Sequence, residues 1–311
     1  MAEWLKRAFW EERWCVGLIE EAAFWRSAEN GVLADRDVQW LRSSNDYFLA
    51  DPCWISESER LFTAECFHYR RRIGSLLLVK ESDGKAVPMG TIKVNNVHHS
   101  YPMVYPHGDA FLVIPESAGC NSVNAISIDR SGKVIDETPI LSGMRLVDPT
   151  VFSHGGAYWM FANPLDNFDD ELVVFRGESV VGPWYATALG PLSIPNCRGA
   201  GRIFAKDGIL YWPTQYNSDR YGGGVVLRRI ISLTETELEH DVAAVIMPDP
   251  KGSRPLGFHT VSNGENHYLV DGLAHAFSPI KPLYVLMSRF QRRLRRPAHS
   301  GSDASASAEQ G

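Results

Sequence analysis

Short apolar runs recur along most of the chain with a period of roughly fifty residues, separated by glycine-containing or polar turns. Each period starts with a strand-like segment that contains polar residues, at positions 48–52, 98–102, 147–150, 199–203 and 257–260. A second apolar run follows each one, at positions 60–65, 110–116, 157–162, 209–213 and 267–271. This strand–turn–strand repeat predicts an all-β fold, a five-bladed β-propeller whose first strands line one central funnel.

We expect a single propeller domain over residues 1–280, with short N-terminal and C-terminal helices. The blades are expected at about 46–95, 101–141, 146–188, 201–238 and 242–273. Residues 1–12 are predicted to form a helix, and a strand at 14–19 is predicted to join the last blade and close the ring, which removes exposed sheet edges. A basic helix over 281–296, packed against the propeller, and a disordered tail over 297–311 complete the predicted organisation.

The composition is that of an ordinary globular protein: 311 residues, of which 44% are hydrophobic and 22% charged. A net charge of −6 does not favour nucleic acid as a partner. The basic run at 289–296 is a local exception. It is either the solvated end of a helix or a patch that meets anionic lipid or a partner protein.

The five cysteines are scattered, without a CxxC pair, and no metal-ligand spacing is present, so we expect no metal and no cofactor. The N-terminal segment has no continuous apolar region of the kind a secretory signal has. No apolar stretch reaches the eighteen or so residues of a membrane span, so no transmembrane segment is predicted. These features predict a cytoplasmic location.

A series of short motifs resembles one known family. The motifs are FLADP at 48–52, TAE at 63–65, HSYP at 99–102, IPES at 114–117, DPT at 148–150, AGRIF at 200–204, YG at 221–222 and HT at 259–260. In this order they resemble the domain family named after the N-terminal part of plant glucosamine inositolphosphorylceramide transferase. That family is also found in bacteria, alone or fused to sugar-modifying enzymes. The resemblance covers roughly residues 12–275.

The family in turn resembles five-bladed glycoside hydrolases of the β-fructosidase and arabinanase type. In those enzymes an Asp-Pro of blade one supplies the base or nucleophile, an Asp-Pro of blade three orients the site, and a later glutamate is the acid. The resemblance therefore implies that Asp51 is the base or nucleophile and that Asp148 orients the site. The chain departs from the pattern in blade four, where Arg202 stands in place of the glutamate.

Two glutamates end apolar second strands, where a carboxylate is costly unless it is paired or functional. Glu116 is the candidate general acid, with a pKa raised by apolar neighbours, and Glu65 is a candidate binding residue. The structural alternatives for both glutamates are an ion pair with Arg202 or Arg198, or hydrogen bonds from the amides of a loop.

Further candidates for substrate binding are Arg202, His99, Tyr101, Gln215, Tyr221 and His259. Arg202 and the histidines would add positive charge to the funnel, and arginine binds carboxylate or phosphate with two parallel hydrogen bonds. This positive charge predicts an anionic ligand such as a uronate, a sugar phosphate or a nucleotide sugar. The alternatives are that Arg202 only neutralises an aspartate and that the tyrosines are packing residues.

Two functions follow. The first is a carbohydrate-active enzyme that acts on an anionic or activated sugar in surface-glycan biosynthesis or remodelling, with Asp51, Glu116 and Asp148 as catalytic residues. The second is a non-catalytic, sugar-binding propeller that serves a partner glycosyltransferase or formyltransferase.

Overall fold

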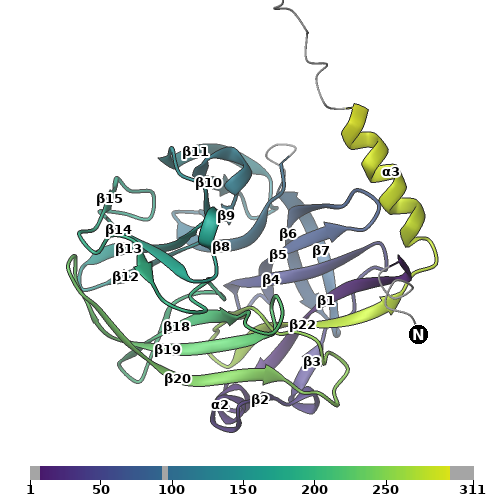
Figure 1. Cartoon of the computed structure of the whole chain (residues 1–311), viewed down its shortest axis with the longest axis horizontal. Coiled ribbons are helices and arrows are strands. Elements are labelled where there is room, and N and C mark those ends of the chain that lie inside the picture. Colours follow the sequence, from purple (N-terminus) through teal and green to yellow (C-terminus); the bar gives the residue numbers. More distant parts are fainter. Residues whose placement is uncertain (1–7, 93–96, 295–311) are drawn as a thin grey trace, which may run out of the picture.

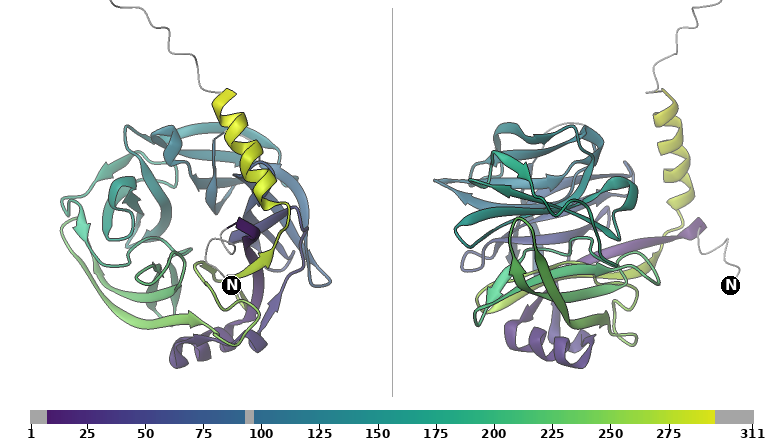
Figure 2. Two further views of the ribbon diagram at one scale, coloured as in Figure 1. Left: turned by 45° about the vertical axis from the view of Figure 1, so that its right-hand side comes forward. Right: turned by 60° about the vertical axis from the view of Figure 1, so that its left-hand side comes forward.

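The computed structural model of the chain describes residues 8–92 and 97–294. Within these residues the strands form five sheets arranged in a ring (Figure 1; Figure 2, left). Blade one contains β4 (Tyr47–Ser56), β5 (Leu61–His68), β6 (Ile73–Ser82) and β7 (Lys85–Ile92), and blade two contains β8 (Ser100–His107), β9 (Ala110–Glu116), β10 (Ser122–Ile128) and β11 (Val134–Ser142). The predicted all-β, five-bladed propeller is confirmed.

The other three blades contain the remaining strands. Blade three has β12 (Leu146–His154), β13 (Ala157–Pro164), β14 (Glu171–Gly177), β15 (Trp184–Ala186) and β16 (Leu192–Ser193). Blade four has β17 (Phe204–Lys206), β18 (Ile209–Tyr216), β19 (Gly224–Leu233), β20 (Leu238–Pro248) and β2 (Val32–Leu33), and blade five has β21 (Val261–Ser262), β22 (His267–Phe277), β1 (Trp10–Glu20) and β3 (Val38–Trp40). The helix α2 (Glu21–Asn30) and three 3₁₀ turns, Asp35–Asp37, Ala118–Cys120 and Leu165–Asn167, lie between these strands.

Blade five is built from both ends of the chain. Strand β1 pairs antiparallel with β22 from Trp10 opposite Phe277 to Glu20 opposite His267. The short β3 then pairs with β1. The first and last strands thus close the ring and leave neither of them as a free sheet edge.

The boundary that we expected between blades four and five is wrong. Strand β20 runs from Leu238 to Pro248 and pairs with β19, so residues 242–248 belong to blade four. The physical reason is the length of β19, whose ten residues pair with an outer strand of eleven residues. Blade five obtains its outer strands from the N-terminal segment instead.

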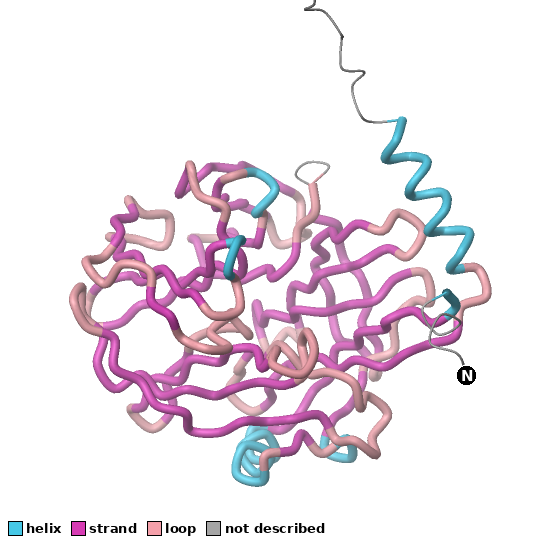
Figure 3. Tube along the Cα trace, viewed as in Figure 1, coloured by secondary structure: helices cyan, strands magenta, loops and turns pink. Residues whose placement is uncertain are grey.

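The helices lie outside the ring of strands (Figure 3). The helix expected over residues 1–12 is contradicted at residues 10–12, because β1 begins at Trp10; residues 1–7 lie outside the described residues. The helix near the N-terminus is instead α2, which buries Phe24 and Ala23 against the core between blades four and five.

The core is a ring of apolar clusters, one between each pair of adjacent blades. Between blades three and four, for example, the rings of Phe161 and Trp212 meet edge to face at 5.2 Å. Because each cluster takes side chains from two sheets, no blade buries its apolar surface alone. The blades therefore hold their inner strands in fixed positions around the centre.

Each of three inner strands, β4, β8 and β12, contains a β-bulge at an equivalent position, and the bulge changes the direction of one side chain. The pairing register shifts at Asp51 in β4, at Tyr101 in β8 and at Asp148 in β12, where φ is 49°, 48° and 48°. Each of these residues precedes a proline, which has no N–H and so removes no ladder hydrogen bond at a bulge. Bulges redirect side chains next to functional sites, and here two of the three are aspartates that reach the funnel.

The C-terminal helix α3 (Lys281–Leu294) does not pack along the propeller as expected but projects away from it (Figures 1 and 2). Its base is tied to the start of β1, because the N–H of Ser278 donates to the carbonyl of Phe9 (2.7 Å) and Lys281 donates to the carbonyl of Trp10. The expected helix end at 295–296 and the expected disordered tail lie outside the described residues. Across the described ranges, no helix combines the length and apolar character that crossing a membrane requires.

Candidate active site

A cavity of about 200 Å³ lies in the funnel and receives side chains from all five blades. Its lining residues are Glu12, Trp14, Phe48, Ala50, Asp51, Glu65, His98, Ser100, Glu116, Asp148, Arg198, Gln215, Tyr221 and His259. Seven residues predicted from the sequence meet here: Asp51, Glu65, Glu116, Asp148, Gln215, Tyr221 and His259. Carboxyl groups dominate the charged part of this wall.

Asp51 of blade one is buried and held by groups from blades two and five. One oxygen, Oδ2, accepts the backbone N–H of Tyr101 at 3.2 Å, and Oδ1 accepts the hydroxyl of Thr260 at 2.8 Å. The Nε2 atom of His259 lies 3.5 Å from Oδ1. Burial raises the pKa of the Asp51 carboxyl, and the neighbouring His259 charge opposes that rise. The aspartate is therefore fixed in position, with one flank facing the cavity.

His259 bridges Asp51 to a second carboxylate, Asp271, which the sequence analysis did not assign to the site. Asp271 is fully buried, and its Oδ2 lies 2.7 Å from Nδ1 of His259. Asp271 also accepts the backbone N–H groups of His259 (3.0 Å), Thr260 (3.1 Å) and Asp51 (3.1 Å). Like Glu65 and Glu116, it lies in a second apolar strand of its blade, and that position was the signal that could have identified it.

The imidazole of His259 is held in a charged environment. Burial alone would lower its pKa, but the carboxylates of Asp271 and Asp51 raise it above the ordinary value. The ring also stacks on Trp14, with centroids 4.0 Å apart. Ligand atoms of Asp51, His259 and Asp271 lie within 4.8 Å of one another, so these three residues are the group that could hold a cation. A protonated His259 supplies positive charge at the same place.

On the opposite side of the cavity, Asp148 is paired with Arg198. The Nε atom of Arg198 donates to Oδ2 of Asp148 at 2.5 Å, and Nε2 of Gln215 donates to the same oxygen at 3.3 Å. A second nitrogen of Arg198 lies 3.6 Å from Glu116. Burial opposes the charge on Arg198, but Asp148 raises the pKa of the guanidinium above its usual range. Arg198, and not Arg202, is the arginine of this cavity.

Glu65 and Glu116 are the two carboxyl groups of the cavity whose pKa is raised well above its ordinary value. Burial, followed by the nearby charge of Asp51, raises the pKa of Glu65 well above its usual range. Burial, followed by the charge of Asp148, does the same for Glu116. Each glutamate therefore keeps a proton to a higher pH than an exposed carboxyl does, which is the property of a general acid.

Three residues predicted to bind substrate do not line this cavity. Arg202 donates to the carbonyl of Val104 and lines a separate cavity of about 710 Å³ between blades one and five. Tyr101 is fully buried, and its hydroxyl bonds to Thr150 (2.8 Å) and to the backbone of Gly201. It cannot stack on a sugar, although its backbone N–H holds Asp51.

His99 is the third of these residues. It is buried outside the cavity, and burial lowers its pKa. Its neighbour His98 lines the cavity instead, with Nε2 lying 3.8 Å from Oε1 of Glu65. Burial also lowers the pKa of His98, so this histidine favours its neutral form.

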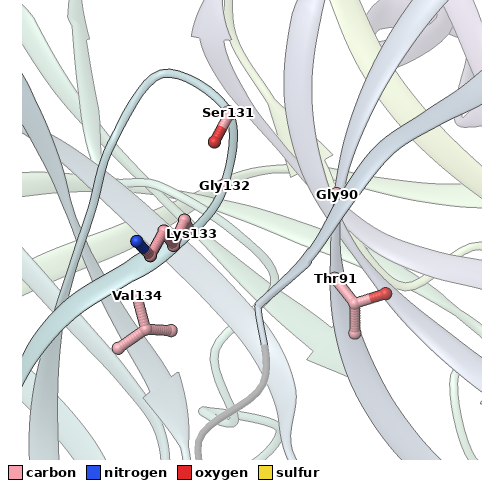
Figure 4. Close-up of a pocket in the computed structure, with 6 residues that line it drawn as sticks. All are labelled: Gly90, Thr91, Ser131, Gly132, Lys133 and Val134. Carbon is pink, nitrogen blue, oxygen red and sulfur yellow. The ribbon is translucent and has the colours of Figure 1, made fainter.

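A further cavity, of about 410 Å³, lies between blades one and two and has a different character (Figure 4). It is lined by Gly90, Thr91, Ser131, Gly132, Lys133 and Val134. Lys133 is the one charged residue in that lining, and no carboxylate faces it there. The central cavity is therefore the candidate for chemistry.

The fold and the carboxyl-lined funnel place the protein among five-bladed propellers with a central site. Two solved structures share the fold. An α-L-arabinofuranosidase from Clostridium thermocellum is 15% identical, with a TM-score of 0.52, and the match covers 71% of this chain and 80% of that one. The RS223 β-xylosidase is 13% identical, with a TM-score of 0.52, and the match covers 75% and 92%.

Residues 18–259 match the family model described as glucosamine inositolphosphorylceramide transferase 1, N-terminal, and the chain belongs to this family. The resemblance stated from the motifs is thereby confirmed. The Arabidopsis thaliana protein glucosamine inositolphosphorylceramide transferase 1 is 28% identical over 251 residues, which are 72% of this chain and 32% of that protein. Its namesake in Oryza sativa subsp. japonica is 28% identical over 151 residues, which are 45% of this chain and 20% of that protein. The chain thus matches a third or less of these relatives.

Proposed function

We propose that the central cavity binds a sugar and that its carboxyl groups act on a glycosidic bond. The observation that carries this proposal is the meeting of Asp51 with two glutamates of raised pKa in one cavity. Cleavage or transfer at a glycosidic bond needs one carboxylate to attack or activate the acceptor and one protonated carboxyl to assist the leaving oxygen. Asp51 takes the first role and Glu116 the second, with Glu65 as the competing acid.

Asp148 has the supporting role in this proposal. Its carboxylate accepts hydrogen bonds from Arg198 and Gln215, which fix it in position. From there its charge raises the pKa of Glu116 and keeps the proton on that glutamate. Asp148 therefore orients and tunes the acid.

The charges that line the cavity indicate which charge a bound sugar would carry. An anionic sugar was expected because of Arg202, which lines another cavity. In the central cavity, Arg198 is already engaged by Asp148 and Glu116, and an anion would have to compete with them. We therefore favour a sugar that is uncharged or carries an amino group. The name of the plant relatives includes glucosamine, an amino sugar, which supports this choice.

The second candidate function is binding without catalysis. Two observations favour it: the orienting aspartate is neutralised by Arg198, and the plant relatives are much longer than the matched region. A propeller that is one part of a larger protein fits a role in holding a sugar for a glycosyltransferase. Fold alone does not decide, because propellers carry many activities.

The test starts with calorimetric titration of the protein with glucosamine, N-acetylglucosamine, glucuronate and their nucleotide-linked forms. Aryl glycosides of the sugar that binds are then assayed for turnover. We expect Asp51→Asn to lower turnover by about a thousandfold or more while changing Kd by less than about tenfold. Asp241→Asn, an exposed change in blade four, is the matched control and should leave both values unchanged.

Leaving groups separate the two candidate acids. A variant that lacks the general acid loses most of its rate with a poor leaving group but keeps it with a good one, such as nitrophenolate. We expect this pattern for Glu116→Gln and not for Glu65→Gln. Binding of a sugar with no turnover by the wild-type protein would reject catalysis and support the binding function, and full turnover by Asp51→Asn would reject the assigned role.

A further inference from the structure

The pair formed by β1 and β22 extends beyond the rest of blade five. These strands pair over their full length, whereas β3 covers only Gly17–Ile19 of β1 and β21 covers only two residues of β22. The far end of the pair therefore protrudes from the propeller as a two-stranded ribbon (Figure 2, right). At its tip the ring of Phe277 lies 6.3 Å from that of Phe9 and 6.0 Å from that of Trp10. Phe277 is 63% exposed, whereas Phe9 and Trp10 are partly buried, so this aromatic tip (Phe9, Trp10, Phe277) presents mainly Phe277 to solvent.

Helix α3 begins directly after the aromatic tip and carries an exposed apolar stripe. Leu283, Leu286 and Met287 are 55%, 66% and 43% exposed, and their spacing places them on one side of a helix. An apolar helix side that its own propeller leaves uncovered indicates a contact with something else.

The charge around this stripe is strongly positive. Residues 272–302 contain no Asp or Glu but include Lys281, Arg289, Arg292, Arg293, Arg295 and Arg296. Arg70 and Arg71, in the turn between β5 and β6, add two more cations, and the guanidinium of Arg70 lies 5.9 Å from the ring of Tyr284. The next residue, Arg72, is paired with Glu11 of β1 at 3.6 Å. The chain as a whole has a net charge of −6, so this concentration of cations is local. Two segments distant in sequence therefore supply cations next to one apolar stripe.

We propose that α3 and the aromatic tip dock the protein on an anionic lipid bilayer. The apolar stripe would lie at the boundary of headgroups and acyl chains, the aromatic rings would sit at the headgroup level, and the arginines would contact anionic lipid. A helix of fourteen residues is about 21 Å long, which suits a helix lying on the surface. This proposal does not depend on the proposed function. It does place the cavity beside the membrane, because Glu12 and Trp14 of β1 line that cavity.

Flotation with vesicles tests the proposal using the full chain. Vesicles of phosphatidylcholine alone are compared with vesicles in which about a third of the lipid is phosphatidylserine, at low and at high salt. We expect at least tenfold stronger partitioning to the anionic vesicles, and weakening at high salt because the attraction is screened. Leu286→Glu, and separately the double change Arg70→Glu with Arg71→Glu, should each weaken binding at least fivefold. Ile231→Glu, an equally exposed apolar position in blade four, should stay within twofold of the wild type.

Several outcomes would overturn the proposal. Equal partitioning to both vesicle types, or unchanged binding by Leu286→Glu, would show that the helix does not recognise an anionic bilayer. An equal loss with Ile231→Glu would show that the effect is not specific to the stripe. Absence of vesicle binding, together with a wild-type dimer that Leu286→Glu converts to a monomer in sedimentation velocity, would assign the stripe to a second copy of the chain.

Discussion

The ionised form of the buried Glu65 lowers the free energy of unfolding, and binding of a proton removes this destabilisation. Its carboxyl is buried among Asp51, Glu116 and Asp148, and the raised pKa reports that the charged form is disfavoured there. The folded state therefore binds this proton more tightly than the unfolded state does. As pH rises from the ordinary value of 4.5 through the higher folded-state value, the folded state loses relative stability.

Glu65→Gln should remove that loss. A pKa difference of one unit corresponds to about 1.4 kcal/mol, so we expect Tm to rise by at least about 2 °C at pH 8. At pH 4 the carboxyl is protonated in both states, and Tm should be nearly unchanged. Thermal melts at the two pH values measure the difference. Glu235→Gln, at a side chain that is 60% exposed, is the control, and an equal change at both pH values for Glu65→Gln would contradict the prediction.

Among single residues, the positions of both aspartates were predicted from the sequence. Arg198 was named only beside Arg202 as an alternative partner of the glutamates, and its pairing with Glu116 at 3.6 Å confirms that alternative. Asp51 and Asp148 precede prolines at equivalent points of two strands, and this local pattern directs both into the funnel. Blade four has no such Asp-Pro bulge, and its chain passes the cavity at Arg198, four residues before the arginine that the motif suggested. Which of two nearby arginines reaches a carboxylate depends on the path of the loop, and that path is set by contacts with other blades.

At the scale of elements, the inner edge of blade four depends on a close approach of two backbones. Gly201 forms a parallel bridge to Val261 of β21 and has a φ of 114°. A Cβ atom at this position would lie 1.9 Å from the carbonyl oxygen of Val261. The glycine thus allows blades four and five to meet beside the funnel, because no other residue leaves room for that carbonyl.

Gly201→Ala should therefore destabilise the protein by about 3–4 kcal/mol, because the two blades must move apart. Gly155→Ala provides a matched control. That residue also has a positive φ, of 59°, but a Cβ there meets nothing within 4 Å, so the cost should be about 1 kcal/mol. Urea unfolding of both variants measures the two costs. Similar losses of unfolding free energy in the two variants would show that the positive φ alone, and not the approach to the Val261 carbonyl, requires glycine at position 201.

Strands marked by an apolar run between two turns were predicted from the sequence. Strands defined mainly by pairing with a strand far away in the sequence were not. The second strands of all five blades were visible as apolar runs between turns, and each contains the expected residues except that β5 begins at Leu61, one residue later than expected. The two-residue β2 was not recognised, because it pairs with β20 from more than two hundred residues away. The outer boundary of blade four was misplaced for the same reason, since the sequence of β20 does not reveal which sheet it joins.

For the whole molecule, the closed ring is the main source of cooperativity. Strand β1 buries Trp14, Val16, Leu18 and Ile19, and its full length pairs with β22. At roughly 1.5–3 kcal/mol for each large apolar side chain, removal of the strand would cost about as much as the total stability of an ordinary domain.

Deletion of residues 1–20 should consequently lower Tm by at least about 10 °C or prevent folding. Deletion of residues 281–311 is the control, because α3 projects from the propeller, and it should change Tm by no more than about 2 °C. Circular dichroism melts of both truncated proteins measure the effects. An unchanged Tm without residues 1–20 would contradict the role of β1 in ring closure.

The pairing of β1 with β22 also determines when the site can form during synthesis of the chain. A ribosome makes β1 about 250 residues before its partner β22, so the partner follows only after tens of seconds of further translation. During that interval the strand has no sheet to join, and the wall formed by Glu12 and Trp14 is missing from the cavity. Blades one to four have time to fold during this interval, but the site is incomplete until β22 has been made. The cavity is assembled last, when Trp14 comes to lie against His259.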